Sequence, residues 1–281
     1  MSLLSDKIIK FCIRLKCCFI LDKGARKKKR AELWENFSRK RFFALIHKKS
    51  NKKTFFCIGD SHTDVFSENT YTEKMPLAPN IFNTIFTGNI HSAPQFVTYH
   101  LDGVLAYSLT RYGTTNQGLE KIEWLIKNGL LPKGCRIVTI FGEPDCRVHV
   151  KKQSERQSCS VEKVIEDIIK NYGAFLTGLK ERGFKIYVYS PIASQKGNME
   201  IDPVFKRFNS ETERNEILLK FEKKLKEFCL KNDLVFISIL PDLLNADLTS
   251  KREYYLPDGV HLNDKGRLLI LKAFSKIGVN Q

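Results

Sequence analysis

The stretch Phe55–Asp64, which reads FFCIGDSHTD, combines a short apolar run with an abrupt polar ending. An apolar run of this length that stops at a Gly/Asp/Ser cluster is typical of a buried strand followed by a turn. In open α/β sheets, the carboxyl ends of the strands are where ligands bind and chemistry takes place. Ser61 is therefore expected where a nucleophile would stand.

Four later runs share this strand-like character. They are rich in β-branched and aromatic residues and read QFVTYH, RIVTIF, FKIYVYS and LVFISIL. Helix-like stretches with an apolar stripe alternate with them, most clearly over 161–182 and 210–231, and a final helix is expected from about Asn263. This alternation predicts an α/β fold with a parallel sheet covered on both faces.

The positive charge of the chain is concentrated near its start. The formal net charge is +16, and residues 1–53 hold 17 Lys/Arg against 4 Asp/Glu, whereas residues 54–281 hold 30 against 27. The change in composition predicts a basic extension over 1–53 and one α/β domain over 54–281. Such an extension is expected to contact an anionic partner, either a membrane surface or a nucleic acid.

Apolar side chains recur at helical spacing within the extension, at Leu4, Ile8, Phe11, Leu15 and Phe19. With basic residues interleaved, this pattern fits an interfacial helix on anionic lipid, and a helix packed on the domain or on a partner is the alternative. Nucleic acid is disfavoured because no nucleic-acid-binding module accompanies the charge. The interleaved charges argue against a membrane-spanning helix and a secretory signal.

The eight cysteines show no paired metal-ligand spacing, and several lie in or beside apolar runs. Free thiols in such places behave as small apolar side chains. The pattern therefore favours free cysteines in a reducing cytoplasm over cysteines paired in disulfides. With the basic extension, this predicts a cytoplasmic protein at the inner face of the membrane. No H-x-H or H-E-x-x-H motif and no Gly-rich phosphate loop is present, so neither a metal nor a cofactor is predicted.

Two residues near the end of the chain complement Ser61 chemically. A serine hydroxyl needs a base within hydrogen-bond reach and a carboxylate to orient that base, and His261 and Asp258 supply both in the turn-rich loop YYLPDGVHLND. Taken singly, Ser61 fits a helix N-cap, Asp258 a turn residue and His261 a structural hydrogen-bonding residue. Taken together, they favour a catalytic triad.

With Gly-Asp-Ser after the first core strand and Asp-x-x-His before the last helix, the chain resembles the SGNH/GDSL hydrolase family. The resemblance covers about residues 54–277 and rests on IGDSH and DGVHLN. It implies a three-layer α/β/α sandwich around a five-stranded, mostly parallel, flavodoxin-like sheet. It also implies that Ser61 is the nucleophile, His261 the base and Asp258 its orienting partner, with the Ser61 N–H helping to bind the oxyanion.

The family's other oxyanion donors are a glycine after the second strand and the asparagine of a Gly-x-Asn-Asp motif. Gly103 is the best match for the glycine, with Gly113 next. In IFGEPDCRVHV, Gly142 and Asp145 match the motif, but Pro144 occupies the asparagine position. Proline has neither a side-chain donor nor an N–H, so one catalytic contact of the family is missing.

Arg147 is the candidate replacement for the missing donor, because it follows the same strand and a guanidinium can donate to an oxyanion. An ion pair with Asp145 or Glu143 that fixes the loop is the equal alternative. Either another group supplies the donor, or the activity is weak, since losing one oxyanion donor costs about two to three orders of magnitude in rate.

A serine triad implies acyl transfer through an acyl-enzyme, and the triad alone does not select the acceptor. The first expectation is an esterase acting on acyl groups of a glycan or another small ester, and the second is an O-acetyltransferase acting on a surface polysaccharide at the membrane. Two further hypotheses remain. One is a non-catalytic domain that binds a glycan or a partner, and the other is an adaptor for anionic surfaces that acts through residues 1–53.

Overall fold

The computed structural model describes residues 3–34, 54–66, 85–89, 96–195 and 209–278. Its central feature is a six-stranded sheet with the order β2-β3-β1-β4-β5-β6. The strands span Ile85–Asn89 (β2), Phe96–His100 (β3), Phe55–Gly59 (β1), Arg136–Ile140 (β4), Lys185–Tyr189 (β5) and Val235–Ile237 (β6). Every pairing is parallel except that of β2 with β3.

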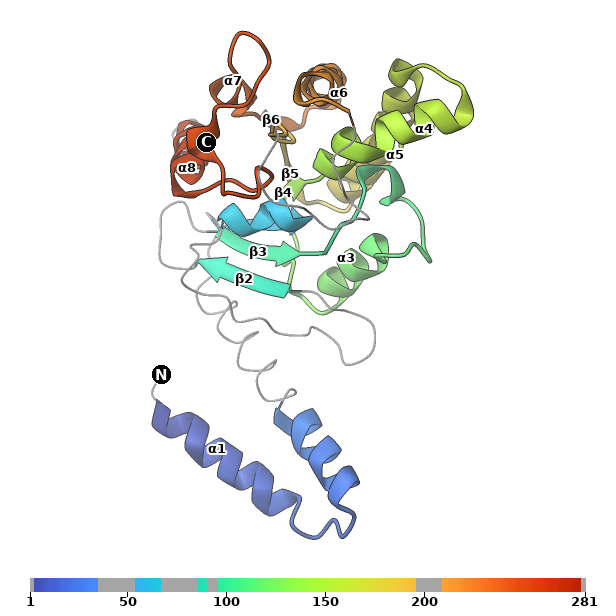
Figure 1. The fold of residues 1–281 in the computed structure, drawn as a ribbon. Coiled ribbons are helices and arrows are strands. Elements are labelled where there is room, and N and C mark those ends of the chain that lie inside the picture. Colours follow the sequence, from blue (N-terminus) through green and yellow to red (C-terminus); the bar gives the residue numbers. More distant parts are fainter. Residues whose placement is uncertain (1–2, 35–53, 67–84, 90–95, 196–208, 279–281) are drawn as a thin grey trace.

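Helices flank this sheet, and Figure 1 shows α8 and α5 on opposite sides of it. The α-helices are Leu3–Lys16 (α1), Gly118–Lys127 (α3), Val150–Gln157 (α4), Val161–Glu181 (α5), Glu211–Lys231 (α6), Leu240–Leu243 (α7) and Asp264–Gly278 (α8). Single turns of other helix types are η1 (Ser61–Phe66), η2 (Ala106–Ser108), η3 (Asp145–His149) and η5 (Arg252–Tyr254). Residues 23–34 form a further helical stretch after α1.

All five predicted strands are present as a parallel set, and the predicted three-layer α/β/α architecture is confirmed. The long predicted helices also match α5, α6 and α8 within two residues. The antiparallel edge strand β2 was not predicted, because IFTGN is short and contains Gly88 and Asn89, both of which disfavour strands. The predicted domain boundary at residue 53 lies outside the described residues.

Apolar rings hold α8 and η1 on one face of the sheet. Phe274 of α8 packs edge-on against Phe55 and Phe96, with ring centroids 5.2 Å apart in both pairs, and Phe66 of η1 contacts Phe96 at 5.3 Å. All four side chains are at most 2% exposed. Because α8 follows the predicted catalytic loop and η1 begins with Ser61, this cluster fixes two parts of the site relative to each other.

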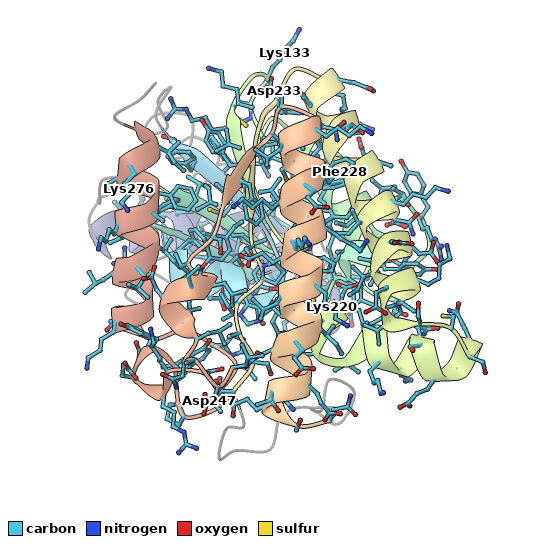
Figure 2. The ribbon with its side chains drawn as sticks, turned by 90° about the horizontal axis from the view of Figure 1, so that it is seen from above. Lys133, Lys220, Phe228, Asp233, Asp247 and Lys276 are labelled. Atoms are coloured by element: carbon cyan, nitrogen blue, oxygen red, sulfur yellow. The ribbon has the colours of Figure 1, made fainter. Side chains whose placement is uncertain are left out.

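On the other face, α5 and α6 lie side by side (Figure 2), and close contacts dock them on the sheet. The Tyr172 hydroxyl of α5 donates to Thr139 Oγ1 of β4 at 2.8 Å. A Cβ on Gly173 would lie 2.5 Å from the ring of Phe228 on α6, so a larger residue would force this ring to move. Both faces of the sheet therefore carry closely packed helices.

The last residue of β1 is a glycine because the neighbouring strand leaves no room for a side chain. A Cβ at Gly59 would lie 2.1 Å from the backbone oxygen of Ile140 in β4, and that same oxygen accepts a hydrogen bond from the Asp60 N–H at 3.2 Å. The position just before the predicted nucleophile is thus set by a backbone-to-backbone contact, which cannot relax by a change of rotamer.

We expect Gly59→Ala to lower the free energy of unfolding by about 3 kcal/mol or more, because strands β1 and β4 would have to separate. Gly178→Ala is the matched control, since Gly178 lies within α5 and a Cβ there meets nothing within 4 Å. That variant is expected to gain about 0.5–1 kcal/mol from helix propensity. Urea unfolding measures both, and equal midpoints for the two variants would contradict the assignment.

Candidate active site

The three predicted catalytic residues come from two distant parts of the chain. Ser61 is the first residue of η1, directly after β1, whereas Asp258 and His261 lie in the loop between η5 and α8. This loop folds back on itself, because the Leu256 N–H donates to the His261 carbonyl at 2.8 Å. Gly259 allows the turn by adopting a left-handed φ of 65°.

The structure brings these three side chains into one hydrogen-bonded chain. His261 Nδ1 lies 2.7 Å from Asp258 Oδ2, and His261 Nε2 lies 2.8 Å from Ser61 Oγ. An ionised carboxylate only accepts hydrogen bonds, so the imidazole proton belongs on Nδ1 and Nε2 is left as the acceptor for the serine hydroxyl. This is the arrangement required for His261 to act as a general base toward Ser61.

Asp258 is held by backbone donors as well as by the imidazole. Its Oδ1 accepts from the N–H groups of Val260 at 2.8 Å and His261 at 3.0 Å. Partial burial raises the pKa of Asp258, but the side-chain hydrogen bond from His261 and the two backbone hydrogen bonds outweigh it, so the pKa lies below its ordinary value. Asp258 is therefore an anion at neutral pH and can stabilise an imidazolium.

A second group of charged side chains is buried beside this triad. Arg147 Nε donates to Glu143 Oε1 at 2.6 Å, and His62 Nε2 lies 3.2 Å from Glu143 Oε2, with all three side chains at most 6% exposed. The His62 ring lies 5.2 Å from the His261 ring, centroid to centroid. We call His62, Glu143 and Arg147 the buried ion network, which contacts the triad through its histidine.

Charge and burial oppose each other within the buried ion network. Burial raises the pKa of Glu143, but the positive charge of Arg147 and the nearby His62 outweigh it, so the pKa lies well below its usual range. Burial lowers the pKa of His62, yet Asp60 and Glu143 outweigh it and raise that pKa above its ordinary value. Glu143 is therefore a buried anion compensated by the Arg147 guanidinium, with His62 as a second close partner.

Asp145 does not face a substrate, which differs from its predicted role in oxyanion or substrate binding. Its carboxylate is completely buried and accepts from the N–H groups of Ala106 at 2.8 Å and Tyr107 at 3.2 Å. Burial raises its pKa to about 7, although both backbone hydrogen bonds lower it. Asp145 thus ties the loop after β4 to the loop after β3, and a carboxylate enclosed in this way cannot reach a ligand.

Gly142 and Pro144 shape the loop between β4 and η3. Gly142 has a φ of 113°, and a Cβ there would lie 2.9 Å from Pro191 and 3.0 Å from the ring of Phe221. Backbone conformation and packing thus account for this predicted site residue. Pro144 begins the π-helical turn at a φ of −62°, where it offers no hydrogen-bond donor.

Two backbone N–H groups, those of Ser61 and Gly103, remain candidates for binding an oxyanion. Within the described part of the chain, no acceptor is recorded for the N–H of Ser61 or of Gly103. The loop carrying Gly103 is fixed to the end of β1, because the Leu101 N–H donates to the Gly59 carbonyl at 2.7 Å. Arg147 instead directs its Nε to Glu143, which is the ion pair that the sequence offered as the alternative to oxyanion binding.

The role of His62 in the site was missed from the sequence, whereas the ion pair of Glu143 with Arg147 was one of its two alternatives. The i,i+4 spacing of Glu143 and Arg147 is the signal that indicates such an ion pair on a helical turn. The partnership with His62 spans two strands and has no local signature. Among the described residues, no group of three or more His, Cys, Asp or Glu side chains is arranged to hold a metal ion.

Comparisons with known proteins identify the family and the fold. Residues 55–274 match the family described as GDSL-like lipase/acylhydrolase. A search among curated proteins found no match. Among solved structures, a GDSL-like lipase from Bacteroides thetaiotaomicron is similar, with a TM-score of 0.52 and 13% identity over 85% of this chain and 96% of the other.

Two further solved structures have the same fold. A protein from Streptococcus pneumoniae, provisionally described as a platelet activating factor, has a TM-score of 0.52 and 16% identity over 90% of this chain and 98% of its own. A protein from Bacteroides fragilis, provisionally described as an acylhydrolase, has a TM-score of 0.50 and 14% identity over 81% of this chain and 87% of its own. At these identities, the similarity establishes the fold alone.

We expect Glu143→Gln to lower the free energy of unfolding at pH 7 by about 3–5 kcal/mol, because Arg147 and His62 would lose a buried anionic partner. The pH dependence gives a second readout. A lowered folded-state pKa means that the stabilisation is complete above the ordinary glutamate pKa of about 4.3 and is lost as the pH falls below it. The variant should therefore lose less stability on acidification than the wild type.

The matched control is Glu162→Gln, which removes one partner of an exposed pair with Lys220 on the surface of α5 and α6. Exposed ion pairs contribute little, so this variant should unfold at nearly the wild-type urea concentration. Equal behaviour of the two variants in urea titrations between pH 2 and pH 8 would contradict the buried ion network.

Proposed function

Because the chain belongs to the GDSL-like lipase/acylhydrolase family and is a serine esterase, we propose that it hydrolyses acyl esters of a glycan or another small molecule through an acyl-enzyme on Ser61. The observation that carries this proposal is the unbroken hydrogen-bonded chain from Asp258 through His261 to the Ser61 hydroxyl. Partial exposure of His261, at 35% of its side chain, supports access of a substrate to this chain.

In the first half of the reaction, Ser61 Oγ attacks the ester carbonyl carbon while its proton passes to His261 Nε2. The imidazolium that forms is stabilised by the anionic Asp258. Collapse of the tetrahedral intermediate breaks the bond to the alcohol oxygen, and His261 returns the proton to that oxygen. The alcohol leaves, and the acyl group stays on Ser61 as an ester.

In the second half, water takes the place of the alcohol. The water oxygen attacks the acyl carbon while His261 Nε2 accepts a proton from the water. His261 then passes this proton to Ser61 Oγ as the bond between the acyl group and Ser61 breaks and the carboxylic acid leaves. If a sugar hydroxyl entered in place of water, the same steps would move the acyl group to a polysaccharide. The choice between hydrolysis and transfer therefore depends on the acceptor and not on the triad.

The negative charge that develops on the carbonyl oxygen needs donors. The N–H groups of Ser61 and Gly103 are proposed for this role, since neither has a recorded acceptor in the described part of the chain. Pro144 adds none, and Arg147 is engaged with Glu143. This incomplete set supports a slower enzyme than one in which an asparagine stands at position 144.

We expect Ser61→Ala to abolish hydrolysis of p-nitrophenyl acetate and Asp258→Asn to lower kcat by about 10⁴-fold, because the second variant loses the group that orients and charges the imidazole. Asp242→Asn, which alters an exposed carboxylate of α7, is the control and should keep full activity. Initial rates with matched circular dichroism spectra measure the effect. Undiminished activity of folded Ser61→Ala would contradict the proposal.

We expect Pro144→Asn to raise kcat toward the same ester by about 10²-fold, because the amide would restore the donor that the family motif provides. The backbone at residue 144 has ordinary helical angles, which asparagine can adopt. An unchanged kcat would mean that another group already fills the donor position. If both the wild type and this variant are inactive, the non-catalytic binding reading gains support instead.

A further inference from the structure

Among the described residues, the largest concentration of exposed apolar side chains lies far from the active site, in the basic extension. Ile8, Phe11 and Leu15 of α1 are 57%, 61% and 52% exposed, and Phe19 and Leu21 after the helix are 89% and 92% exposed. Elsewhere in the described chain, the large apolar side chains with comparable exposure occur singly. A contiguous exposed apolar surface of this kind indicates a binding site.

The exposed row is separate from the contact that α1 makes with the helical stretch 23–34. Ile8, Phe11 and Leu15 are spaced by three and four residues and therefore share one side of α1. Cys17, in the turn that follows α1, is completely buried, whereas each member of the row is more than half exposed. Figure 1 shows α1 and the stretch 23–34 as a helical hairpin set apart from the sheet, so the α/β domain does not cover the row.

Local contacts hold the hairpin in shape. In the turn, Arg26 Nε donates to the Ile20 carbonyl at 2.6 Å, and the Ala25 N–H donates to Asp22 Oδ1 at 2.5 Å. Farther along, Lys10 Nζ lies 4.8 Å from the ring centroid of Trp34, which joins the two helices by a cation–π contact. The row is thus presented by a folded element.

Charge identifies the kind of surface that would cover this row. Residues 8–34 contain nine Lys/Arg and two Asp/Glu. A nucleic acid would engage the cations but would leave the row of Phe and Leu side chains in water. An anionic bilayer engages both, because lysine and arginine side chains meet the headgroups while the apolar side chains enter the acyl boundary.

We propose that the hairpin of α1 and residues 23–34 docks the protein on an anionic lipid surface, with Ile8, Phe11, Leu15 and Phe19 inserted at the interface. The described residues include no helix that is long and apolar enough to cross a bilayer. Docking would bring the α/β domain next to lipid-borne or membrane-proximal esters. It rests on observations independent of the triad and stands whether or not the enzyme is active.

The test is co-sedimentation of the full-length protein with vesicles of phosphatidylcholine alone or with one quarter phosphatidylglycerol. Wild type is expected to bind the anionic vesicles and to be weakened by salt, since the Debye length falls from about 10 Å at 0.1 M to about 3 Å at 1 M. The triple variant Phe11→Ser, Leu15→Ser, Phe19→Ser should lower the partition coefficient by more than about tenfold.

The matched control replaces two exposed leucines of the α/β domain, Leu230→Ser with Leu268→Ser, and should bind as wild type does. Three results would overturn the proposal: no binding of wild type to anionic vesicles, equal binding by the triple variant, or retention on duplex DNA without retention on vesicles. A fourth contradicting result would be that the wild type is a dimer, that the triple variant is a monomer, and that neither binds vesicles. Gel filtration without vesicles gives that readout.

Discussion

The hydrogen bond between Ser61 Oγ and His261 Nε2 joins two residues 200 positions apart, and the rest of the structure is arranged so that this bond can form. Parallel pairing places the end of β1 beside the ends of β3 and β4. Packing of α8 on the same sheet through Phe274 places the loop that precedes it over that edge. The side chains of a triad built on two loops keep their relative positions only because both loops are attached to one rigid sheet.

Backbone contacts at the end of β1 fix the positions of the neighbouring loops. Gly59 admits the Ile140 carbonyl so closely that a methyl group would collide with it. The Gly59 carbonyl in turn accepts the Leu101 N–H, which holds the loop that contains Gly103. The nucleophile and a candidate oxyanion donor are therefore positioned by backbone contacts of the same residue, Gly59.

Charges buried around the site reinforce the loops after β1 and β4. Glu143 joins Arg147 on its own turn to His62 on η1, and Asp145 joins the turn to two N–H groups of the loop after β3. Removing one partner of such a group costs more than the group itself contributes to stability, because an uncompensated buried charge remains. These loops are consequently coupled, and a change in one is expected to alter the position of Ser61.

Local pattern was sufficient to predict the five parallel strands, the three long helices, and Ser61, Asp258 and His261 as candidate triad residues. Each of these has a signature within about ten residues, such as an apolar run that ends at Gly-Asp-Ser. The edge strand β2 and the partnership of His62 with Glu143 have none, because each depends on which strands become neighbours. Asp145 was predicted at the site from its motif position, but its burial between two loops is a property of the tertiary structure.

The account depends on Ser61 being an activated nucleophile despite Pro144, and covalent labelling tests this most directly. Treatment with a fluorophosphonate probe, followed by intact mass and peptide mapping, should give one adduct per chain at Ser61. The adduct should be absent from Ser61→Ala and strongly reduced in His261→Ala. A folded, monodisperse sample that takes up no probe, or that is labelled equally after His261→Ala, would contradict the account and favour a binding domain.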